Sequence, residues 1–323
     1  MSAAPLTDHS IIYIKLRPQE QQTHSNGYWK FNSYLLTHEP YCINIRQLIT
    51  EVQQMENFTS HLNKWDFFKY KVRQYSITYS KELKKQQMET ELKLTQELNN
   101  ICNKPILTDD DKHTLLTLQT LLDGMYARKA AGAFIRSRAK RIEEGEKNSA
   151  YFCRLEKARQ QNNEIRTLLI NNDICQDQKK ISNEILSFYS QLYASKFSAT
   201  DALTFFDDIK CHIPEIDETL RDTCDAELRV QELDLVIQNI KLDKSPGVDG
   251  LTANFYRHFW EDISEFIFQT FLEILNSHTL TTSMKQGIII LIPKLGKDPT
   301  ILDNRRPITL LTTDYKLLTE NRS

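Results

Sequence analysis

Four basic side chains lie close together in the segment PKLGKDPTILDNRRPITLL, from Pro293 to Leu311. They are Lys294, Lys297, Arg305 and Arg306. The apolar run GIIILIP leads into the segment and PITLL closes it, so the pattern predicts two strands joined by a basic turn. Arginine offers a bidentate fork to phosphate, and lysine offers a mobile point charge. The turn is therefore predicted to meet a triphosphate or a polynucleotide backbone, unless it is a hydrated hairpin end.

A second candidate anion site is the stretch KSPGVDG, from Lys244 to Gly250. Proline fixes φ and glycine frees it, so Ser-Pro-Gly and Asp-Gly both favour turns. Thr252 is predicted to cap a following helix, and turn amides at a helix N-terminus attract anions. The predicted phosphate contacts are Lys244, Ser245 and Gly247. The alternative is an ordinary turn that carries a stray lysine.

A third basic region spans residues 128–159, with ten Lys or Arg against four Asp or Glu. Tyr151 and Phe152 lie among these bases. Basic residues interleaved with aromatics suit a nucleic-acid backbone with stacked bases. A solvated helix face whose aromatics pack on a neighbouring helix has the same composition. The predicted backbone contacts are Arg136, Arg138, Lys140 and Arg141.

The totals restrict the class of protein. The net charge is only -2 over 323 residues, because residues 201–234 carry eleven acids against three bases and offset the basic regions. The six cysteines form no C-x-x-C pair, so we do not expect a zinc site. Scattered thiols of this kind fit a reducing compartment. No apolar run approaches ~20 residues, and the N-terminus lacks a signal-peptide pattern. We expect no membrane partner and a cytoplasmic or nuclear protein that is not secreted.

Helical periodicity dominates the chain. Apolar residues keep a spacing of three and four from Phe68 to Tyr79 and onward to Leu98, which predicts a long amphipathic helix. Thr108 before three aspartates is predicted to cap an antiparallel partner helix. Other predicted elements are a strand at 10–16, helices at 181–193, 233–240 and 255–275, and an acidic stretch of loops and short helices at 201–234. The predicted fold class is mainly α with a small β-hairpin.

Taken together, these motifs resemble one family. KSPGVDG, ILIPKLGKDP and RRPITLL occur in the order found at the start of the reverse transcriptase of long interspersed (non-LTR) retrotransposons. GEKNSAYFCRLEKAR, YWKFNSYLL and the helix at 65–83 are similar to the connecting region upstream of that polymerase. TDHSIIYIKL, at 7–16, looks like the last strand of the endonuclease that precedes it. The resemblance covers almost the whole chain.

The resemblance implies three parts. Residues 1–27 would be an endonuclease remnant and linker, residues 28–195 a long helical connector, and residues 196–323 the α+β fingers of the polymerase, with the palm absent. Asp8 and His9 match the end of the endonuclease's Ser-Asp-His motif, where they would support the scissile phosphate beside magnesium. Without the other metal-binding acids they would be a remnant and not a site.

The resemblance also assigns roles to the two turns. Lys294, Lys297 and Arg306 would face the phosphates of the incoming nucleotide or the template, with Arg306 at the family's R-P-I position. The KSPGVDG loop would grip template RNA. Arg305 stands where the family more often has an aromatic residue, and Val248 replaces a second proline.

Catalysis is not expected from these residues. In the family the carboxylates that hold two magnesium ions belong to the palm, downstream of R-P-I. We therefore expect no cofactor here and no small-molecule substrate, although magnesium serves the complete family enzyme. Phe205-Phe206-Asp207-Asp208 matches the aromatic-x-Asp-Asp signature of a polymerase site, but it precedes the finger strands around PKLGK and RPI, so an acidic loop is predicted.

The predicted function is that of a truncated reverse transcriptase fragment that binds RNA or single-stranded DNA. A different class of protein, a helical scaffold that binds other proteins through the long helix and its partner, remains as an alternative. A third possibility is an incomplete reading of a longer gene that continues into a palm.

Overall fold

The computed structural model describes residues 2–3, 10–11, 28–137, 165–195, 197–210, 217–219, 221 and 227–320. The description includes side chains in 28–129 and in the later ranges except at Asp208. The chain divides into two compact units: unit 1 contains Met1–Ser25 and Ser80–Arg166, and unit 2 contains Asn26–Tyr79 and Thr167–Ser323. The three-part division at 28 and 196 stays a prediction.

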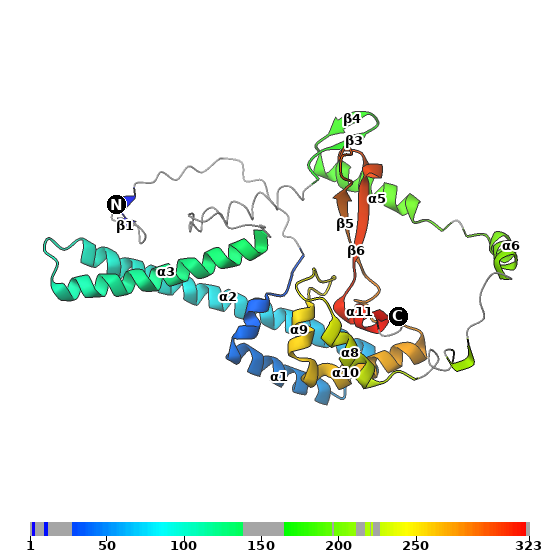
Figure 1. Cartoon of the computed structure of the whole chain (residues 1–323), viewed down its shortest axis with the longest axis horizontal. Coiled ribbons are helices and arrows are strands. Elements are labelled where there is room, and N and C mark those ends of the chain that lie inside the picture. Colours follow the sequence, from blue (N-terminus) through cyan, green and yellow to red (C-terminus); the bar gives the residue numbers. More distant parts are fainter. Residues whose placement is uncertain are drawn as a thin grey trace. The chain divides into compact units, whose positions relative to one another are not determined.

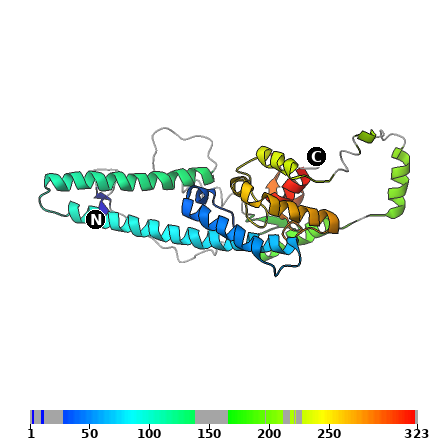
Figure 2. The ribbon, with the colours of Figure 1, turned by 90° about the horizontal axis from the view of Figure 1, so that it is seen from below.

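Unit 1 contains a helical hairpin. The later part of α2 (His61–Cys102) and α3 (Asp109–Ser137) run side by side in both ribbon views (Figures 1 and 2). Thr108 Oγ1 accepts a hydrogen bond from Asp111 N at 3.2 Å, and an Asp111 carboxylate oxygen accepts one from Thr108 N at 3.1 Å. This reciprocal cap starts α3 as its sequence predicts. The helices share a small core of Leu98, Leu118 and Leu122.

At the N-terminus, two short strands pair antiparallel. They are β1 (Ser2–Ala3) and β2 (Ser10–Ile11). The strand predicted over 10–16 is described only at its first two residues, and the rest of it lies outside the described residues.

Unit 2 joins helices from distant parts of the sequence. They are η1 (Ser33–Thr37), α1 (Glu39–Gln54), the start of α2, α5 (Gln178–Leu192), α6 (Ala199–Lys210), α8 (Val230–Asn239), α9 (Ala253–His258), α10 (Trp260–Ser277), η2 (Leu302–Asn304) and α11 (Thr313–Glu320). The single helix predicted over 255–275 is wrong, because the chain turns at Phe259, with ψ of 17°, between α9 and α10.

The acidic loop predicted at Phe205-Phe206-Asp207-Asp208 is also wrong. These residues lie within α6. Ala202, Phe205, Phe206 and Ile209 have the 0, 3, 4, 7 spacing of a helix face, and this periodicity outweighs the run of acids.

An aromatic core ties the early helices of unit 2 to the late ones. Trp65 on α2 contacts Phe266 on α10, with ring centroids 5.1 Å apart. Phe31, before η1, contacts Phe255 on α9 at 5.3 Å. All four side chains are buried, and burial of each contributes on the order of 2 kcal/mol. Residues 28–79 and the region around 251–274 therefore share one core, although most of the chain separates them in sequence.

Two antiparallel hairpins complete the described part of unit 2. β3 (Leu168–Ile170) and β4 (Asp173–Cys175) are joined by Asn171 and Asn172, whose φ angles of 51° and 68° suit a tight hairpin turn. β5 (Ile288–Pro293) and β6 (Arg305–Leu310) form a longer pair, which we call the β5–β6 ribbon. Its return strand is the one that the sequence predicts. The described residues are mainly helical with small β-hairpins, which confirms the predicted fold class.

Candidate nucleic-acid interface

The predicted basic turn is the loop end of the β5–β6 ribbon (Figure 1). Two of its four bases bind the loop's own backbone. Lys294 Nζ donates to the carbonyl oxygen of Asp303 at 2.7 Å, and Arg305 Nε donates to that of Pro299 at 2.9 Å. Partial burial lowers the pKa of Arg305, and the nearby Tyr189 of α5 acts in the opposite direction. These two bases therefore shape the loop.

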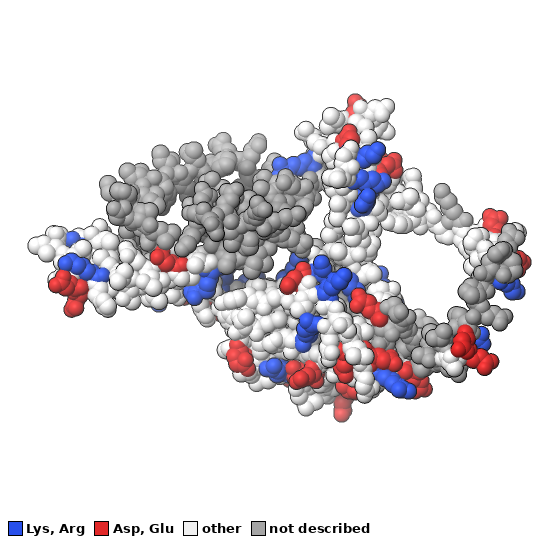
Figure 3. Space-filling view, in the orientation of Figure 1, with Lys and Arg blue, Asp and Glu red and all other residues white. Residues whose placement is uncertain are grey.

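Lys297 and Arg306 are different, because both are exposed and the side chain of neither makes a hydrogen bond or ion pair with another described residue. Gly296, with φ of +71°, lets the loop turn between the two strands. In the space-filling view, Lys and Arg side chains gather on the surface of this hairpin region, with acidic ones beside them (Figure 3). The bases that remain available for a phosphate are therefore Lys297 and Arg306.

The KSPGVDG loop is a packing junction between elements of unit 2. A Cβ on Gly247 would lie 2.4 Å from Thr312 N, and one on Gly250, where φ is +77°, would lie 2.3 Å from the ring of Trp29. Real Cβ atoms do not approach other atoms so closely, so both positions need glycine. Phe31 N also donates to Gly250 O at 2.9 Å. The two glycines therefore bring the loop against the strand-to-helix connection before α11 and against the segment before η1.

The polar side chains in and next to the KSPGVDG loop differ in exposure and hydrogen bonding. Lys244 is exposed and Ser245 is half-buried. Thr252 precedes α9, but its buried hydroxyl has no hydrogen-bond partner, so the predicted side-chain cap is wrong. With only six residues in α9, this helix end offers little dipole for an anion.

A buried group of charges fixes the same junction, and we call it the ionic cluster. Its members are Lys69 and Asp66 from α2, Asp249 from the KSPGVDG loop and Asp314 from α11. Lys69 Nζ lies 2.6 Å from Asp314 Oδ2, 3.2 Å from Asp66 Oδ1 and 3.8 Å from Asp249 Oδ2. Trp65 Nε1 donates to Asp314 Oδ2 at 2.8 Å. The cluster therefore links three segments that the sequence keeps far apart.

The ionic cluster has more carboxylates than cations, and the pKa values respond to this. Burial raises the pKa of Asp249 to about 7, against the opposing effect of Lys69. Burial would lower the pKa of Lys69, but the surrounding carboxylates, Asp314 first, raise it overall. Burial would raise the pKa of Asp314, but Lys69 and hydrogen bonds lower it overall. Lys69 and Asp314 therefore stay charged at neutral pH, and Asp249 is the member that titrates there.

The ionic cluster does not fit a magnesium ion. The ammonium group of Lys69 already lies between the carboxylates, where a cation would bind. Within the described ranges, no group of three or more His, Cys, Asp or Glu side chains could hold a metal ion. No metal-dependent step can be derived from these residues.

Buried Cys42 and exposed His258 form a second polar contact, with Sγ and Nε2 3.4 Å apart. Burial raises the pKa of the Cys42 thiol and lowers the pKa of His258. Both shifts favour the neutral forms, whereas a nucleophilic cysteine needs a thiolate. The pair is therefore a packing contact between α1 and α9.

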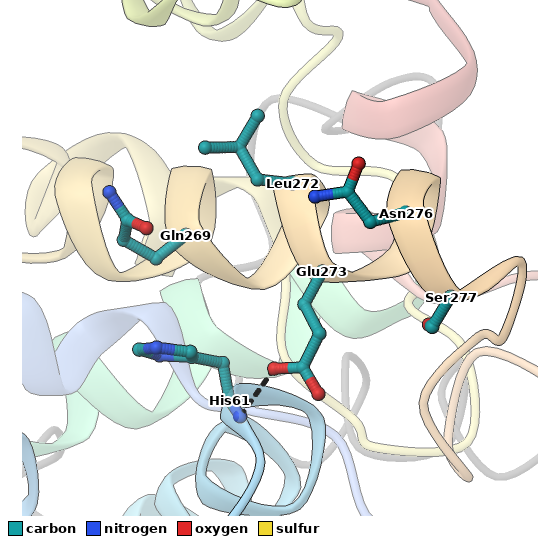
Figure 4. Close-up of a pocket in the computed structure, with 6 residues that line it drawn as sticks. All are labelled: His61, Gln269, Leu272, Glu273, Asn276 and Ser277. Atoms are coloured by element: carbon teal, nitrogen blue, oxygen red, sulfur yellow. Dashed lines mark hydrogen bonds between the residues drawn. The ribbon is translucent and has the colours of Figure 1, made fainter.

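An open pocket lies beside the start of α2 (Figure 4). Glu273 of α10 accepts hydrogen bonds from His61 N and from Ser60 Oγ, both at 2.7 Å. A carboxylate at a helix N-terminus satisfies free amides and the helix dipole. The charged group of this pocket is therefore used to cap α2. The lining residues are His61, Gln269, Leu272, Glu273, Asn276 and Ser277.

Several predicted contacts lie outside the described residues. They are Asp8, His9, Arg138, Lys140 and Arg141. Arg136 is within α3, but its side chain is not described. Nucleic-acid binding by this basic region stays a prediction.

The described helices include none that is both long and apolar enough to cross a membrane.

Comparisons with known proteins give a second source of information beside the helical core and cationic β-ribbon of unit 2. No protein-family model matches the sequence. The chain is 25% identical over 319 residues to the "Transposon TX1 uncharacterized 149 kDa protein" of Xenopus laevis. The match covers 98% of this chain and 24% of that protein, so the chain spans about a quarter of its relative. The similarity indicates a transposon-derived protein.

Proposed function

We propose that this chain is the connector and fingers portion of a non-LTR retrotransposon reverse transcriptase, and that it binds RNA or single-stranded DNA. The order of the KSPGVDG, PKLGKDP and RRPITLL motifs supports the family, and the similarity to a transposon protein supports its origin. We propose no catalytic step for the described carboxylates around Lys69, because Lys69 occupies the place where magnesium would bind.

The observation that supports the binding proposal is which basic side chains of the ribbon loop are already hydrogen-bonded and which are not. Two bases, Lys294 and Arg305, hold the loop in shape, while the side chains of Lys297 and Arg306 are exposed and have no partner among the described residues. An arginine at the end of a strand and a lysine on the adjoining turn can contact neighbouring phosphates of one strand.

The test is the salt dependence of binding to a labelled single-stranded RNA. We expect the double variant Lys297→Ala, Arg306→Ala to bind more weakly than the wild type. The slope of log K against log salt should become shallower by about 1.4, because each lost phosphate contact on a single strand accounts for about 0.7. Lys93→Ala, at an exposed lysine on α2, is the matched control and should leave the slope unchanged. Equal slopes for all three proteins, or no binding at low salt, would refute the proposal.

A second candidate function is a helical scaffold that binds another protein through the hairpin of unit 1. The specific observation is that Met88, Leu92, Leu116 and Leu121 of α2 and α3 are more than half exposed. Exposed apolar side chains on a helical hairpin favour protein contacts. Replacing Met88 and Leu92 by Ser should release a bound protein partner without changing RNA binding, whereas the ribbon variant should have the opposite effect.

A further inference from the structure

The two faces of the β5–β6 ribbon are covered unequally at its loop end. Because side chains alternate along a strand, the register places Ile290, Ile292, Arg306 and Ile308 on one face. The three isoleucines are 38%, 44% and 43% exposed, and Arg306 is exposed as well. We call this the open face. Isoleucine is seldom left exposed in such a group, so the open face is incomplete as it stands.

The opposite face is partly covered at the loop end, where Leu291, Arg305 and Pro307 are half-buried, although Ile289 and Pro293 on the same face are exposed. Arg305 lies on that face, and the electrostatic influence of Arg305 on the phenol of Tyr189 places the C-terminal part of α5 next to it. Leu169 N of β3 also donates to Thr300 O of the ribbon loop at 2.9 Å. In Figure 1, β3 and β4 lie at this end of the ribbon. The element that follows α5 is therefore joined to this end of the ribbon by a short connection.

That next element is α6, which has a face of matching chemistry. Ala202, Phe205, Phe206 and Ile209 form one apolar stripe. Phe205 and Phe206 are each 59% exposed, and Asp201 lies at one edge of the stripe. An apolar stripe with an acidic residue at its edge complements an apolar face that ends in Arg306.

The chain between the two elements is short. α5 ends at Leu192 and α6 begins at Ala199, so residues 193–198 are the whole connection. Six residues span at most about 20 Å when extended. That reach is enough to pass around a two-stranded ribbon, whose strands are about 5 Å apart. A link of this length gives α6 an effective concentration in the millimolar range at the open face.

We propose that α6 folds back within the same chain and covers the open face of the β5–β6 ribbon. Phe205 and Phe206 pack on Ile290, Ile292 and Ile308, and Asp201 lies near Arg306. This contact keeps apolar side chains out of water. It also occupies an arginine that the function proposed above assigns to phosphate, so α6 competes with nucleic acid, and this consequence rests on that proposed function.

The test is site-specific photo-crosslinking in the full chain. A p-benzoyl-phenylalanine at position 205 is expected to crosslink to peptides from Ile288–Pro293 or Arg305–Leu310 in the monomeric product. The matched control is the same probe at Thr204, which is exposed on the opposite side of α6 and should give little of this product. Equal crosslinking from both positions, crosslinks to other segments, or products found only between two chains would overturn the proposal.

A second measurement separates this inference from the proposed function. Phe205→Ser with Phe206→Ser changes only exposed side chains, so the fold should persist. We expect this variant to bind single-stranded RNA about fivefold more tightly than the wild type, the lower end of common coupling between sites. If neither protein binds RNA, the proposed function fails while the crosslinking result still decides whether α6 covers the ribbon. Unchanged RNA affinity together with the expected crosslink would show that α6 covers the open face but does not compete with RNA.

Discussion

At the scale of single residues, Lys69 is the most informative side chain of the protein. Its side chain is 3% exposed, and its ammonium group lies within hydrogen-bond distance of Asp314 and in ion-pair distance of Asp66 and Asp249. A buried cation with several buried carboxylates is stable only while the set is complete, since each member compensates the desolvation of the others. The ionic cluster therefore makes α2, the KSPGVDG loop and α11 depend on one another.

The first prediction concerns removal of the cation. Lys69→Met should lower the free energy of unfolding by about 3–5 kcal/mol, because it leaves buried carboxylates without a counter-charge. Lys71→Met, on the exposed side of the same helix, is the control and should change it by less than about 0.5 kcal/mol. Urea denaturation followed by circular dichroism measures both. Similar values for the two variants would show that the ionic cluster does not support unit 2.

The second prediction concerns pH. Burial raises the pKa of Asp249 to about 7 in the folded protein, well above that of an unfolded aspartate. The favourable contribution of its protonated form is complete below the unfolded pKa of about 4 and is lost as pH rises through 7. Asp249→Asn keeps the side chain neutral. The stability of this variant relative to wild type should therefore increase from pH 5 to pH 8, by about 1–3 kcal/mol.

The measurement for Asp249 is a series of urea denaturations at pH 5, 6, 7 and 8. The difference in unfolding free energy between the two proteins cancels the contribution of the other carboxylates, because their titration is common to both. A difference that is constant over this range, or that falls as pH rises, would contradict the raised pKa of Asp249.

At the scale of elements, the KSPGVDG loop is held by glycines with distinct requirements. Gly247→Ala would drive a Cβ into the backbone at Thr312, and Gly250→Ala would meet Trp29 in a left-handed conformation. Both substitutions should lower the midpoint of thermal unfolding by many degrees, with a cost of about 2–4 kcal/mol each from overpacking and strain. Gly296→Ala has a positive φ, as Gly250 does, but open space around it, and should cost only about 1 kcal/mol. Equal losses at Gly250 and Gly296 would show that φ, and not close packing, sets the requirement at Gly250.

Gly124 gives an opposite expectation within α3. A Cβ there would touch nothing within 4 Å, and the residue is exposed within a helix. Gly124→Ala should therefore stabilise the hairpin of unit 1 by about 0.5–1 kcal/mol. Thermal unfolding followed at 222 nm checks this, and a loss of helix stability would contradict the assignment of residues 109–137 to one continuous helix.

At the scale of the whole molecule, unit 2 draws on two separate parts of the sequence. Trp65 and Phe31 come from the first part and pack on Phe266 and Phe255 of the second. A fragment of residues 196–323 would lose these aromatics together with Lys69. We expect it to lack a cooperative unfolding transition and to aggregate, since the side chains that pack on residues 28–79 and the ribbon face next to α5 would be uncovered. Adding residues 28–79 through a flexible linker should restore cooperative unfolding. A fragment 196–323 that unfolds cooperatively alone would instead support a domain boundary at 196.

Much of the fold could be predicted from local patterns in the sequence. The spacing of apolar residues predicted the α2–α3 hairpin, Thr108 and Asp111 predicted its cap, and GIIILIP with PITLL predicted the β5–β6 ribbon, because these signals act over a few residues. The exceptions were local too. The helix predicted over 255–275 is broken at Phe259, and α6 forms where acids indicated a loop, because periodicity and backbone turns compete over the same few positions.

The sequence by itself determined which residues carry positive charge on the basic turn, and its motif order determined the family that the chain resembles. Only the tertiary structure decided which bases are available, since the side chains of Lys294 and Arg305 donate to the loop backbone while those of Lys297 and Arg306 have no partner among the described residues. Only the tertiary structure brought Lys69, Asp249 and Asp314 together. The physical reason is that hydrogen bonding and charge pairing depend on distance in space, and positions 69 and 314 come within 2.6 Å only when the aromatic core of unit 2 has closed.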